Sequence, residues 1–388
     1  MNIKELANKY RDYIIDLRRE FHMYPESSWE EVRTSSRVKE ELDKLEIPYI
    51  SIAGTGVLAT IKGKKIGKTV ALRGDMDALE TTETNDIPYK SKHHGKMHAC
   101  GHDGHTAMLI GAANILNDIR DEINGTIHLI FQPAEEVAGG AKKIIEESNF
   151  MDEVDSIFGI HLWSDVESGK VSVEAGPRMA SADFFTIDIK GKAGHGSMPH
   201  QGIDAVVAAS ATVMNLQSVV SRELSPLDSA TLTIGSFHSG TRFNIIAGDA
   251  KLEGTTRCFK PEIRENFPEI IERIAKNTAA SYRAEATLSY TWGTPSTIND
   301  ESYSKIATAS VEKLLGKDGV VEMEKTTGGE DFAYFLEKAP GVFAFVGIRN
   351  EEKGACYPHH HDKFNMDEDA LEIGAALYAQ YAIDFLNN

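Results

Sequence analysis

Residues 98–105, with the sequence His-Ala-Cys-Gly-His-Asp-Gly-His, place one thiol, three imidazoles and one carboxylate within eight positions. Cys100 and His102 are two positions apart, so they can ligate one metal ion or an adjacent pair. Thiolate sulfur and imidazole nitrogen suit Zn, Mn, Co or Ni better than Ca or Mg. The alternative is a histidine-rich surface loop with one buried cysteine. The segment therefore predicts a metal site whose other ligands must come from the rest of the chain.

A pair of acids, Glu135 and Glu136, follows the apolar run 127–131 and Pro133. A loop at this position can direct both carboxylates into one pocket. In a metallohydrolase, one acid of such a pair binds the ion and the other takes a proton from the attacking water. The alternative is a solvated helix start, because Glu is favoured in a first helical turn. Considered in isolation, the pair fits that alternative better.

Asp75 and Asp77 follow the apolar run 70–73, and His161 ends the apolar run 157–161. Side chains two positions apart in extended chain point the same way, so one of the aspartates could orient a metal-ligating histidine by a hydrogen bond. Both could equally be turn residues. A lone histidine such as His161 is more often a core residue, but with the other candidates also at strand ends we interpret it as a ligand.

The roles of several further residues cannot be decided from residue type and spacing alone. Composition cannot choose a ligand among the adjacent histidines 359–361. The loop 194–200 displays His195, and Asn244 and Arg257 lie in separate segments. Arg can grip a carboxylate with two hydrogen bonds, and a neutral His or Asn can donate to a developing oxyanion. A turn and ordinary surface residues are equally good explanations.

The elements that must position these residues alternate between helix and strand. Helical spacing covers 6–21, and strand-like runs cover 57–61, 70–73, 127–131 and 157–161, with helical segments between the later runs. This order predicts an α/β fold with a mainly parallel sheet covered on both faces. Ligands of such folds gather at the carboxyl ends of strands, where the candidate residues lie.

The order of elements changes after about residue 182. The sequence predicts a strand at 183–190, a helix at 202–223, strands at 230–237 and 250–259, a helix at 261–283 and a strand at 286–292. This β-α-β-β-α-β order is that of a ferredoxin-like sandwich. We therefore expect a discontinuous catalytic, metal-binding domain formed by 1–181 and 293–388, with a smaller domain, 182–292, inserted into it.

Composition agrees with a globular protein of two domains, because 388 residues exceed one ordinary core. The chain has no apolar run of about 18 residues, and its first 20 residues lack the features of a secretory signal, so we expect a cytoplasmic protein without a membrane partner. Three cysteines are too few for a disulfide framework. A net charge of −18 argues against nucleic acid as a partner.

Seven segments together resemble the M20 metallopeptidases, and more narrowly the branch with hippurate hydrolases, N-acyl-amino-acid deacylases (aminoacylases) and plant auxin-conjugate hydrolases. The segments are 73–79, 98–105, 132–136, 159–163, 194–200, 328–332 and 360–364. They occur in the order of the family and span nearly the whole chain. Glu80 and Asp362 stand where the family usually has Pro, which leaves the local loop shape uncertain and affects no proposed ligand.

The resemblance implies a centre of two divalent metal ions (Zn, Mn, Co or Ni). Its ligands would be Cys100, His102, Glu136, His161 and His360. Glu135 would be the general base, and Asp77 the acid beside the metal-site histidine. His360 is preferred over its neighbours because the ligand of the family lies four residues before a Phe, here Phe364.

The same resemblance implies a substrate site that involves the inserted domain. Its residues would be His195, Asn244, Arg257, Gly328 and Gly329. In relatives the partner subunit can lend the counterpart of His195, so the inserted domain would act as a lid and in dimerisation. We expect a homodimer or a higher homo-oligomer.

The sequence thus predicts a metal-dependent amidohydrolase that cleaves N-acyl-L-amino acids, with an acetyl, benzoyl or similar acyl group, into a carboxylic acid and a free amino acid. A dipeptidase or aminopeptidase with the same two-metal centre is the nearest alternative. A metal-binding protein without catalysis is a further one, although such a protein has no need of a base at Glu135.

Overall fold

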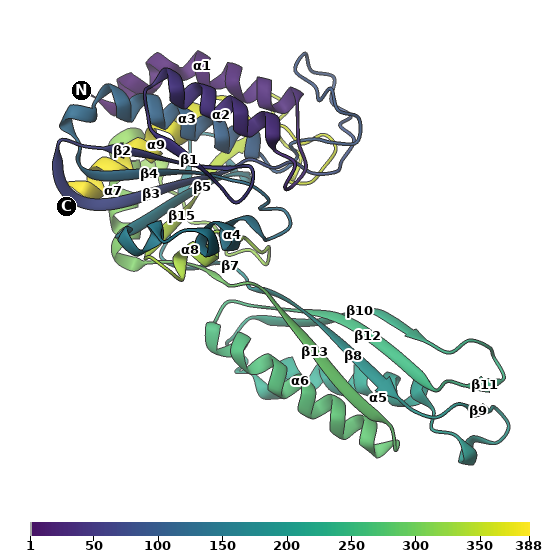
Figure 1. Ribbon diagram of the computed structural model, residues 1–388. Helices are drawn as coiled ribbons and strands as arrows, with labels where there is room; N and C mark the ends of the chain where they lie inside the picture. Colours follow the sequence, from purple (N-terminus) through teal and green to yellow (C-terminus); the bar gives the residue numbers. More distant parts are fainter. Residues whose placement is uncertain (1) are drawn as a thin grey trace. The chain divides into compact units, whose positions relative to one another are not determined.

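The computed structural model describes residues 2–388, which form two compact units. The large unit comprises 1–178, 298–324 and 331–388, of which residue 1 lies outside the described part. The small unit comprises 179–297 and 325–330. Figure 1 shows the elements of each unit.

The large unit is built on a seven-stranded sheet in the order β1-β2-β4-β3-β5-β15-β6. The strands are β1 Tyr49–Ile52, β2 Gly56–Lys62, β4 Asn124–Gln132, β3 Lys65–Asp75, β5 Ser156–Glu167, β15 Gly341–Arg349 and β6 Val171–Ser172. Strands β4, β3, β5 and β15 run parallel, and the outer strands β1, β2 and β6 pair antiparallel. The predicted α/β class with a mainly parallel sheet is confirmed. The strand ends that carry the candidate residues therefore lie along one edge of the sheet.

Helices cover both faces of this sheet (Figure 1). They are α1 Ile3–Met23, α2 Val32–Lys44, α3 His102–Asp118, α4 Gly140–Glu147, α7 Glu301–Leu315, α8 Ala333–Leu336 and α9 Asp369–Leu386. Short 3₁₀ turns lie at Arg120–Glu122, Phe150–Glu153 and Lys317–Gly319, and short strands at β7 Gly176–Met179 and β14 Thr297–Asn299. Helices α3 and α9 contact β3, and α1 packs on both helices.

Helix α3 is the centre of the core of the large unit. Its residues from His102 to Leu116 are buried, and it packs between α1, α9 and the sheet. A side chain at Gly111 would start 2.5 Å from Ile14 Cδ1 and 3.0 Å from Ala375 Cβ, so glycine permits the close approach of α3 to both helices. Within residues 2–388, no helix is both long enough and apolar enough to cross a membrane.

The small unit has a four-stranded antiparallel sheet in the order β10-β12-β8-β13, with two helices packed together on one face. Its elements are β8 Ala182–Lys190, β9 Gly194–His195, a 3₁₀ turn Pro199–Gln201, α5 Ala205–Ser218, β10 Ala230–Ser239, β11 Ile245–Ile246, β12 Asp249–Cys258, α6 Pro261–Ser281 and β13 Glu285–Thr294. The β-α-β-β-α-β order of its long elements is the one that the sequence predicts. Residues 325–330 also belong to this unit.

The predicted helix 202–223 differs from the observed one at both ends. Gly202 is extended, and Asp204 caps α5 by accepting hydrogen bonds from the backbone N–H groups of Val206 and Val207. The helix changes to a π-helical turn at Val219–Glu223. Hydrophobic spacing cannot detect either change, because a cap and one turn of different pitch leave the apolar pattern intact.

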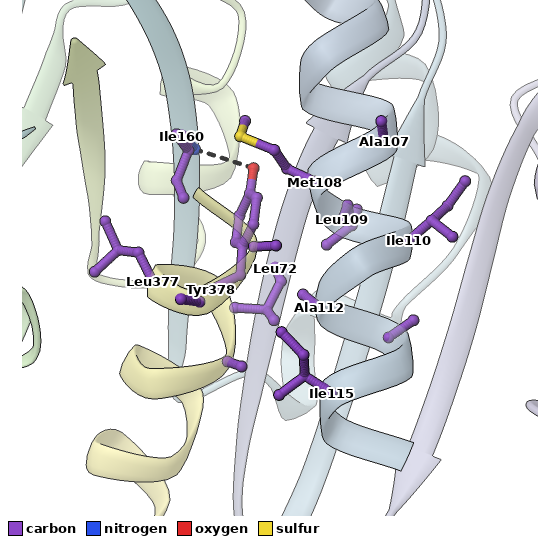
Figure 2. Packing of buried hydrophobic residues seen from close by; sticks show 14 of the residues in the cluster. Leu72, Ala107, Met108, Leu109, Ile110, Ala112, Ile115, Ile160, Leu377 and Tyr378 are labelled. Carbon is purple, nitrogen blue, oxygen red and sulfur yellow. Dashed lines mark hydrogen bonds between the residues drawn. The ribbon is translucent and has the colours of Figure 1, made fainter. Parts of the chain in front are cut away.

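Tyr378 supplies a polar link inside the apolar core (Figure 2). Its hydroxyl accepts from Ile160 N at 3.2 Å and donates to Arg73 O at 2.5 Å.

Tyr378→Phe leaves both backbone groups without this partner, so we expect unfolding free energy to fall by about 1–3 kcal/mol in urea denaturation. The control Tyr282→Phe, at a side chain that is 41% exposed, should change it by less than about 0.5 kcal/mol. Equal effects of the two substitutions would contradict the assignment.

Candidate metal centre

Cys100 and His102 flank the turn that starts helix α3. Gly101 between them has φ +98°, a left-handed conformation that glycine adopts without strain. The backbone N–H of His360 donates to Ala99 O at 2.8 Å, so a segment 260 residues further along the chain is fastened beside Cys100. The local turn and this long-range hydrogen bond together place three predicted ligands next to one another.

Asp77 fixes the orientation of His102. His102 Nδ1 lies 2.9 Å from Asp77 O and 3.3 Å from Asp77 Oδ1. Both oxygens are acceptors, so Nδ1 carries a proton, and Nε2 is the nitrogen that faces the other candidate ligands. The same carboxylate accepts a hydrogen bond from Ser28 Oγ at 2.6 Å. Asp77 therefore has the geometry of a residue that orients a metal ligand.

Glu135 and Glu136 lie in a turn between β4 and α4. The helix begins only at Gly140, so the pair does not form the first turn of a helix. The N–H groups of the two glutamates donate to Asp77 Oδ1 and Oδ2 at 3.1 and 3.0 Å. Glu135 Oε2 and Glu136 Oε1 then lie 4.0 and 3.9 Å from His102 Nε2. The turn thus directs both carboxylates towards His102.

His161 and His360 complete the group of predicted ligands. His161 donates from Nδ1 to Leu162 O at 2.7 Å, and its Nε2 lies 3.6 Å from Cys100 Sγ. His360 Nε2 lies 3.7 Å from Glu136 Oε2. The backbone of His360 has φ +65°, which is unusual for a residue with a side chain and is often found at functional sites.

The other two histidines of the 359–361 run are engaged elsewhere. His359 bonds Leu162 O at 2.9 Å through Nε2 and Ser164 Oγ at 3.0 Å through Nδ1, so neither nitrogen is available. His361 pairs with Asp362 at 2.9 Å. Geometry therefore separates His360 from its neighbours, which composition alone could not do.

Other polar residues of the 98–105 segment turn away from these ligands. Asp103 pairs with Arg18 at 2.9 Å and with His22 at 2.7 Å. His105 donates to Asp75 Oδ1 at 2.5 Å through Nδ1 and accepts from the N–H of Leu162 at 2.9 Å through Nε2. Both nitrogens of His105 are thus occupied, so it supports the site from behind and is no candidate ligand.

The predicted ligands form two overlapping groups of three. One group is Cys100, His102 and His161, and the other is Cys100, Glu136 and His360; within each, the donor atoms lie within 4.8 Å of one another. Ligands of one tetrahedral ion with bonds of about 2.0–2.3 Å lie about 3.3–3.8 Å apart. Two groups that share Cys100 therefore suit two neighbouring ions.

Burial makes the charged forms of several donors unfavourable. It raises the pKa of Glu136 to about 7, with the nearby carboxylates of Asp77 and Asp75 adding to the effect. It raises the pKa of Cys100 and lowers that of His161 well below the usual value. Burial opposes the charge of His102 as well, but Asp75, Cys100 and Asp77 together outweigh it and keep the pKa of His102 high. The acidic donors Glu136 and Cys100 thus lie where an additional positive charge would favour their ionised forms.

Two buried atoms point to the source of that charge. His102 Nε2 and Glu136 Oε1 have no hydrogen-bond partner within the described chain. Other buried polar atoms of the described chain also lack such a partner, but these two lie 3.9 Å apart within the donor group, where a single cation could contact both. A divalent ion bound by sulfur, nitrogen and carboxylate oxygen fits this donor set. The residues present therefore fit the predicted metal ions.

The predicted substrate residues lie in the small unit. His195 and Asn244 are exposed neighbours, because β9 pairs with β11 and Gly196 N donates to Asn244 O at 3.0 Å. Arg257 is half-buried near the other end of β12. A side chain at Gly329 would start 3.4 Å from Arg257 Nη1. The small unit thus brings His195 close to Asn244, and Arg257 close to Gly329. Gly328, next to Gly329 in the sequence, is exposed.

The large unit also contains buried or partly buried polar residues that contact the candidate site and were not among the site residues predicted from the sequence. Ser28 and Glu31 lie between α1 and α2 and support Asp77 and the 134–136 turn. Arg73 is buried between Asp75 at 2.6 Å and Asp331 at 3.0 Å. Arg73 and Asp331 do stand in segments that resemble the family, but Ser28 and Glu31 carry no motif or spacing signal.

The fold and the donor set define a metal-dependent hydrolase: sulfur, imidazole and carboxylate donors gather at the carboxyl ends of parallel strands, beside an additional acid. The family model described as peptidase family M20/M25/M40 matches residues 71–384. The chain belongs to this family, as the motifs predict.

Similar proteins agree with this assignment. Thermostable carboxypeptidase 1 of Saccharolobus solfataricus is 42% identical over 99% of both chains. N-acetylcysteine deacetylase of Bacillus subtilis is 40% identical over 97% of this chain and 98% of its own. The crystal structure of the YXEP protein of B. subtilis, described as a dinuclear metal-binding peptidase of the M20 family, has a TM-score of 0.87 and 37% identity, and covers 98% of this chain and 99% of its own. The protein is an M20 amidohydrolase with two divalent metal ions as cofactors.

The raised pKa of Glu136 gives a test in metal-free protein. A carboxyl whose folded-state pKa of about 7 exceeds its unfolded value binds protons more tightly when folded, so its contribution to stability is present below about pH 4.5 and is lost as pH rises through 7. Glu136→Gln removes the ionisable group. We expect it to increase the unfolding free energy of chelated protein by about 1–3 kcal/mol at pH 8, and by less at pH 5.

The measurement is urea denaturation of chelated protein at the two pH values, with exposed Glu352→Gln as the control. The same substitution should weaken metal binding, because an amide is a poorer ligand than a carboxylate. A stability change of Glu136→Gln that does not depend on pH would refute the electrostatic account of the site.

Proposed function

We propose that the protein hydrolyses the amide bond of N-acyl-L-amino acids, releasing a carboxylic acid and a free amino acid. The observation that carries the proposal is the turn that holds Glu135 and Glu136 side by side beside His102. Glu136 belongs to the donor group with Cys100 and His360, and Glu135 lies next to it, with Oε2 4.0 Å from His102 Nε2. The deacetylase relative supports an acyl amino acid as the substrate.

The chain would act through its metal ligands, Glu135 and Asp77. The two metal ions, held by Cys100, His102, Glu136, His161 and His360, would polarise the scissile carbonyl and increase the acidity of water. Glu135 accepts the proton of the attacking water and passes it to the departing amine. Asp77 keeps His102 in the tautomer that presents Nε2.

Residues of the small unit would bind the substrate. Arg257 is the candidate for the free carboxylate, and Gly329 lets backbone approach its guanidinium closely. His195 accepts hydrogen bonds at Nδ1 from Ser197 N and Oγ at 3.1 and 2.8 Å, so its proton is on Nε2. From there it can donate to the oxyanion of the tetrahedral intermediate, with Asn244 beside it.

His195 and Arg257 of one chain cannot contact the same small substrate within the small unit. Strand β12 runs from Asp249, at the end next to β9 and β11, to Arg257 eight residues further on, a distance of about 26 Å. We therefore propose that His195 and Asn244 act in the site of a partner subunit, with the small unit as the dimerisation domain.

A peptidase that uses the same centre is the alternative, and the carboxypeptidase relative favours it. Both functions use Arg257 on a free carboxylate, and they differ in what precedes the scissile bond. A side-by-side assay of N-acetyl and N-benzoyl amino acids with unblocked dipeptides separates them. Faster cleavage of unblocked dipeptides would reject the proposed function.

Removal of the base tests the mechanism. Glu135→Ala should lower kcat by at least about 10³-fold, because no other acid of the turn is free for proton transfer once Glu136 binds metal. Metal content, measured by elemental analysis after dialysis, should stay at two ions per chain, as in the wild-type protein. Near-normal hydrolysis of N-acyl amino acids by the variant would show that Glu135 is not the base.

Mixing of two inactive variants tests the contribution of the partner. His195→Ala lacks the oxyanion donor, and Glu135→Ala lacks the base, so each homodimer should be inactive. After exchange of subunits, a hybrid dimer contains one site with both groups intact, and activity should recover to about one quarter of wild type. Two copies of the same variant mixed together are the control. If His195 acted within its own chain, the mixture would stay inactive.

A further inference from the structure

Glu31 is a buried acid in the connection between α1 and α2, and all its partners are uncharged donors. Its side chain has 0% exposure. Glu31 Oε1 accepts from Trp29 N at 3.0 Å and from Ala134 N at 2.8 Å, and Oε2 accepts from Thr55 Oγ1 at 2.6 Å. One carboxylate thus ties together the α1–α2 connection, the turn before β2 and the turn after β4.

This environment is costly for an acid. Within residues 2–388 no ion pair joins Glu31 to a cation, whereas buried Asp103 pairs with Arg18. Burial accordingly raises the pKa of Glu31. A buried carboxylate without a cation costs stability compared with an apolar side chain. Its hydrogen bonds, which an apolar side chain could not form, must then explain why an acid stands here. The role of Glu31 should therefore be sought in what those bonds hold.

The bonds hold an unusual turn. Ala134 has φ +53°, a left-handed conformation that costs about 1–2 kcal/mol for a residue with a side chain. Three successive N–H groups, those of Ala134, Glu135 and Glu136, point at two carboxylates, the first at Glu31 and the other two at Asp77. Without these acceptors nothing compensates for the strain at Ala134, and the turn can relax.

We propose that Glu31 is a positioning residue for the Glu135–Glu136 turn: it holds Ala134 in the left-handed conformation and thereby directs a metal ligand and the general base towards His102. This role rests on the proposed function for Glu135 and on the metal centre for Glu136. Glu31 itself contacts neither substrate nor metal in this role. It acts only through the backbone of the turn.

The test compares Glu31→Ala with Glu31→Gln. The alanine variant loses all three hydrogen bonds. The glutamine variant keeps an oxygen for Trp29 N and Ala134 N, and its amide can donate to the hydroxyl of Thr55. The neighbouring Glu30→Ala is the matched control, because Glu30 lies in the same connection, is exposed and, within residues 2–388, forms an ion pair with Lys96 alone.

Two readouts are needed, of which the first requires no substrate. In calorimetric titration of metal-free protein with Mn²⁺, we expect Glu31→Ala to weaken one of the two binding events 10–100-fold, the usual effect of losing a residue that orients a ligand. The other event should change less than about threefold. In turnover of N-acyl amino acids, kcat should fall by a similar factor with KM nearly unchanged. Glu31→Gln and Glu30→Ala should resemble wild type in both readouts.

Equal loss of both metal-binding events, equal damage by Glu31→Ala and Glu31→Gln, or no effect of Glu31→Ala would each overturn the proposal. Absence of N-acyl hydrolysis in the wild-type protein would overturn the proposed function instead, and the titration would still decide the role of Glu31. If Glu31→Ala does not fold, Thr55→Val replaces it. That variant removes only the bond to Oε2 and should weaken the same metal-binding event, while Thr55→Ser should not.

Discussion

The carboxylate of Asp77 is the contact on which the rest of the site depends. It lies within hydrogen-bond reach of His102 and accepts from Ser28 and from two backbone N–H groups of the Glu135–Glu136 turn. One carboxylate therefore links the segment after β3, the turn after β4 and the start of α3. Such sharing explains how residues far apart in sequence keep separations of a few ångström.

Buried charge around the strand ends stabilises this arrangement from behind. Arg73, at the end of β3, is enclosed by Asp75 and Asp331, and Asp75 in turn bonds His105, which holds the backbone next to His161. Pairs of this kind stabilise a fold little compared with apolar packing, but they fix direction, because each partner is left buried and unpaired if it moves. In the large unit the apolar core supplies most of the stability, and the buried charged side chains fix the positions of the strand ends.

Much of this could be predicted from the sequence, and the failures have physical reasons. Long periodic segments and the position of polar residues at strand ends gave the α/β class and the proposed ligands, because parallel strands deliver their carboxyl ends to one edge. The resemblance to a family singled out His360, which composition could not. Ser28 and Glu31 were missed because their hydrogen bonds to Asp77 and Ala134 span 49 and 103 residues, and such long-range contacts leave no mark on sequence spacing. The extended Gly202 and the π-helical turn at Val219–Glu223 are local backbone choices that the apolar pattern does not record.

The spread of the proposed ligands along the chain has a consequence for how the enzyme acquires its metals. Cys100 and His360 are separated by 260 residues, and the backbone of His360 is fastened beside Cys100 only in the finished fold. A nascent chain that ends before residue 360 can offer no more than one of the two donor groups. The proposed second donor group is therefore complete only when nearly all of the polypeptide has been synthesised.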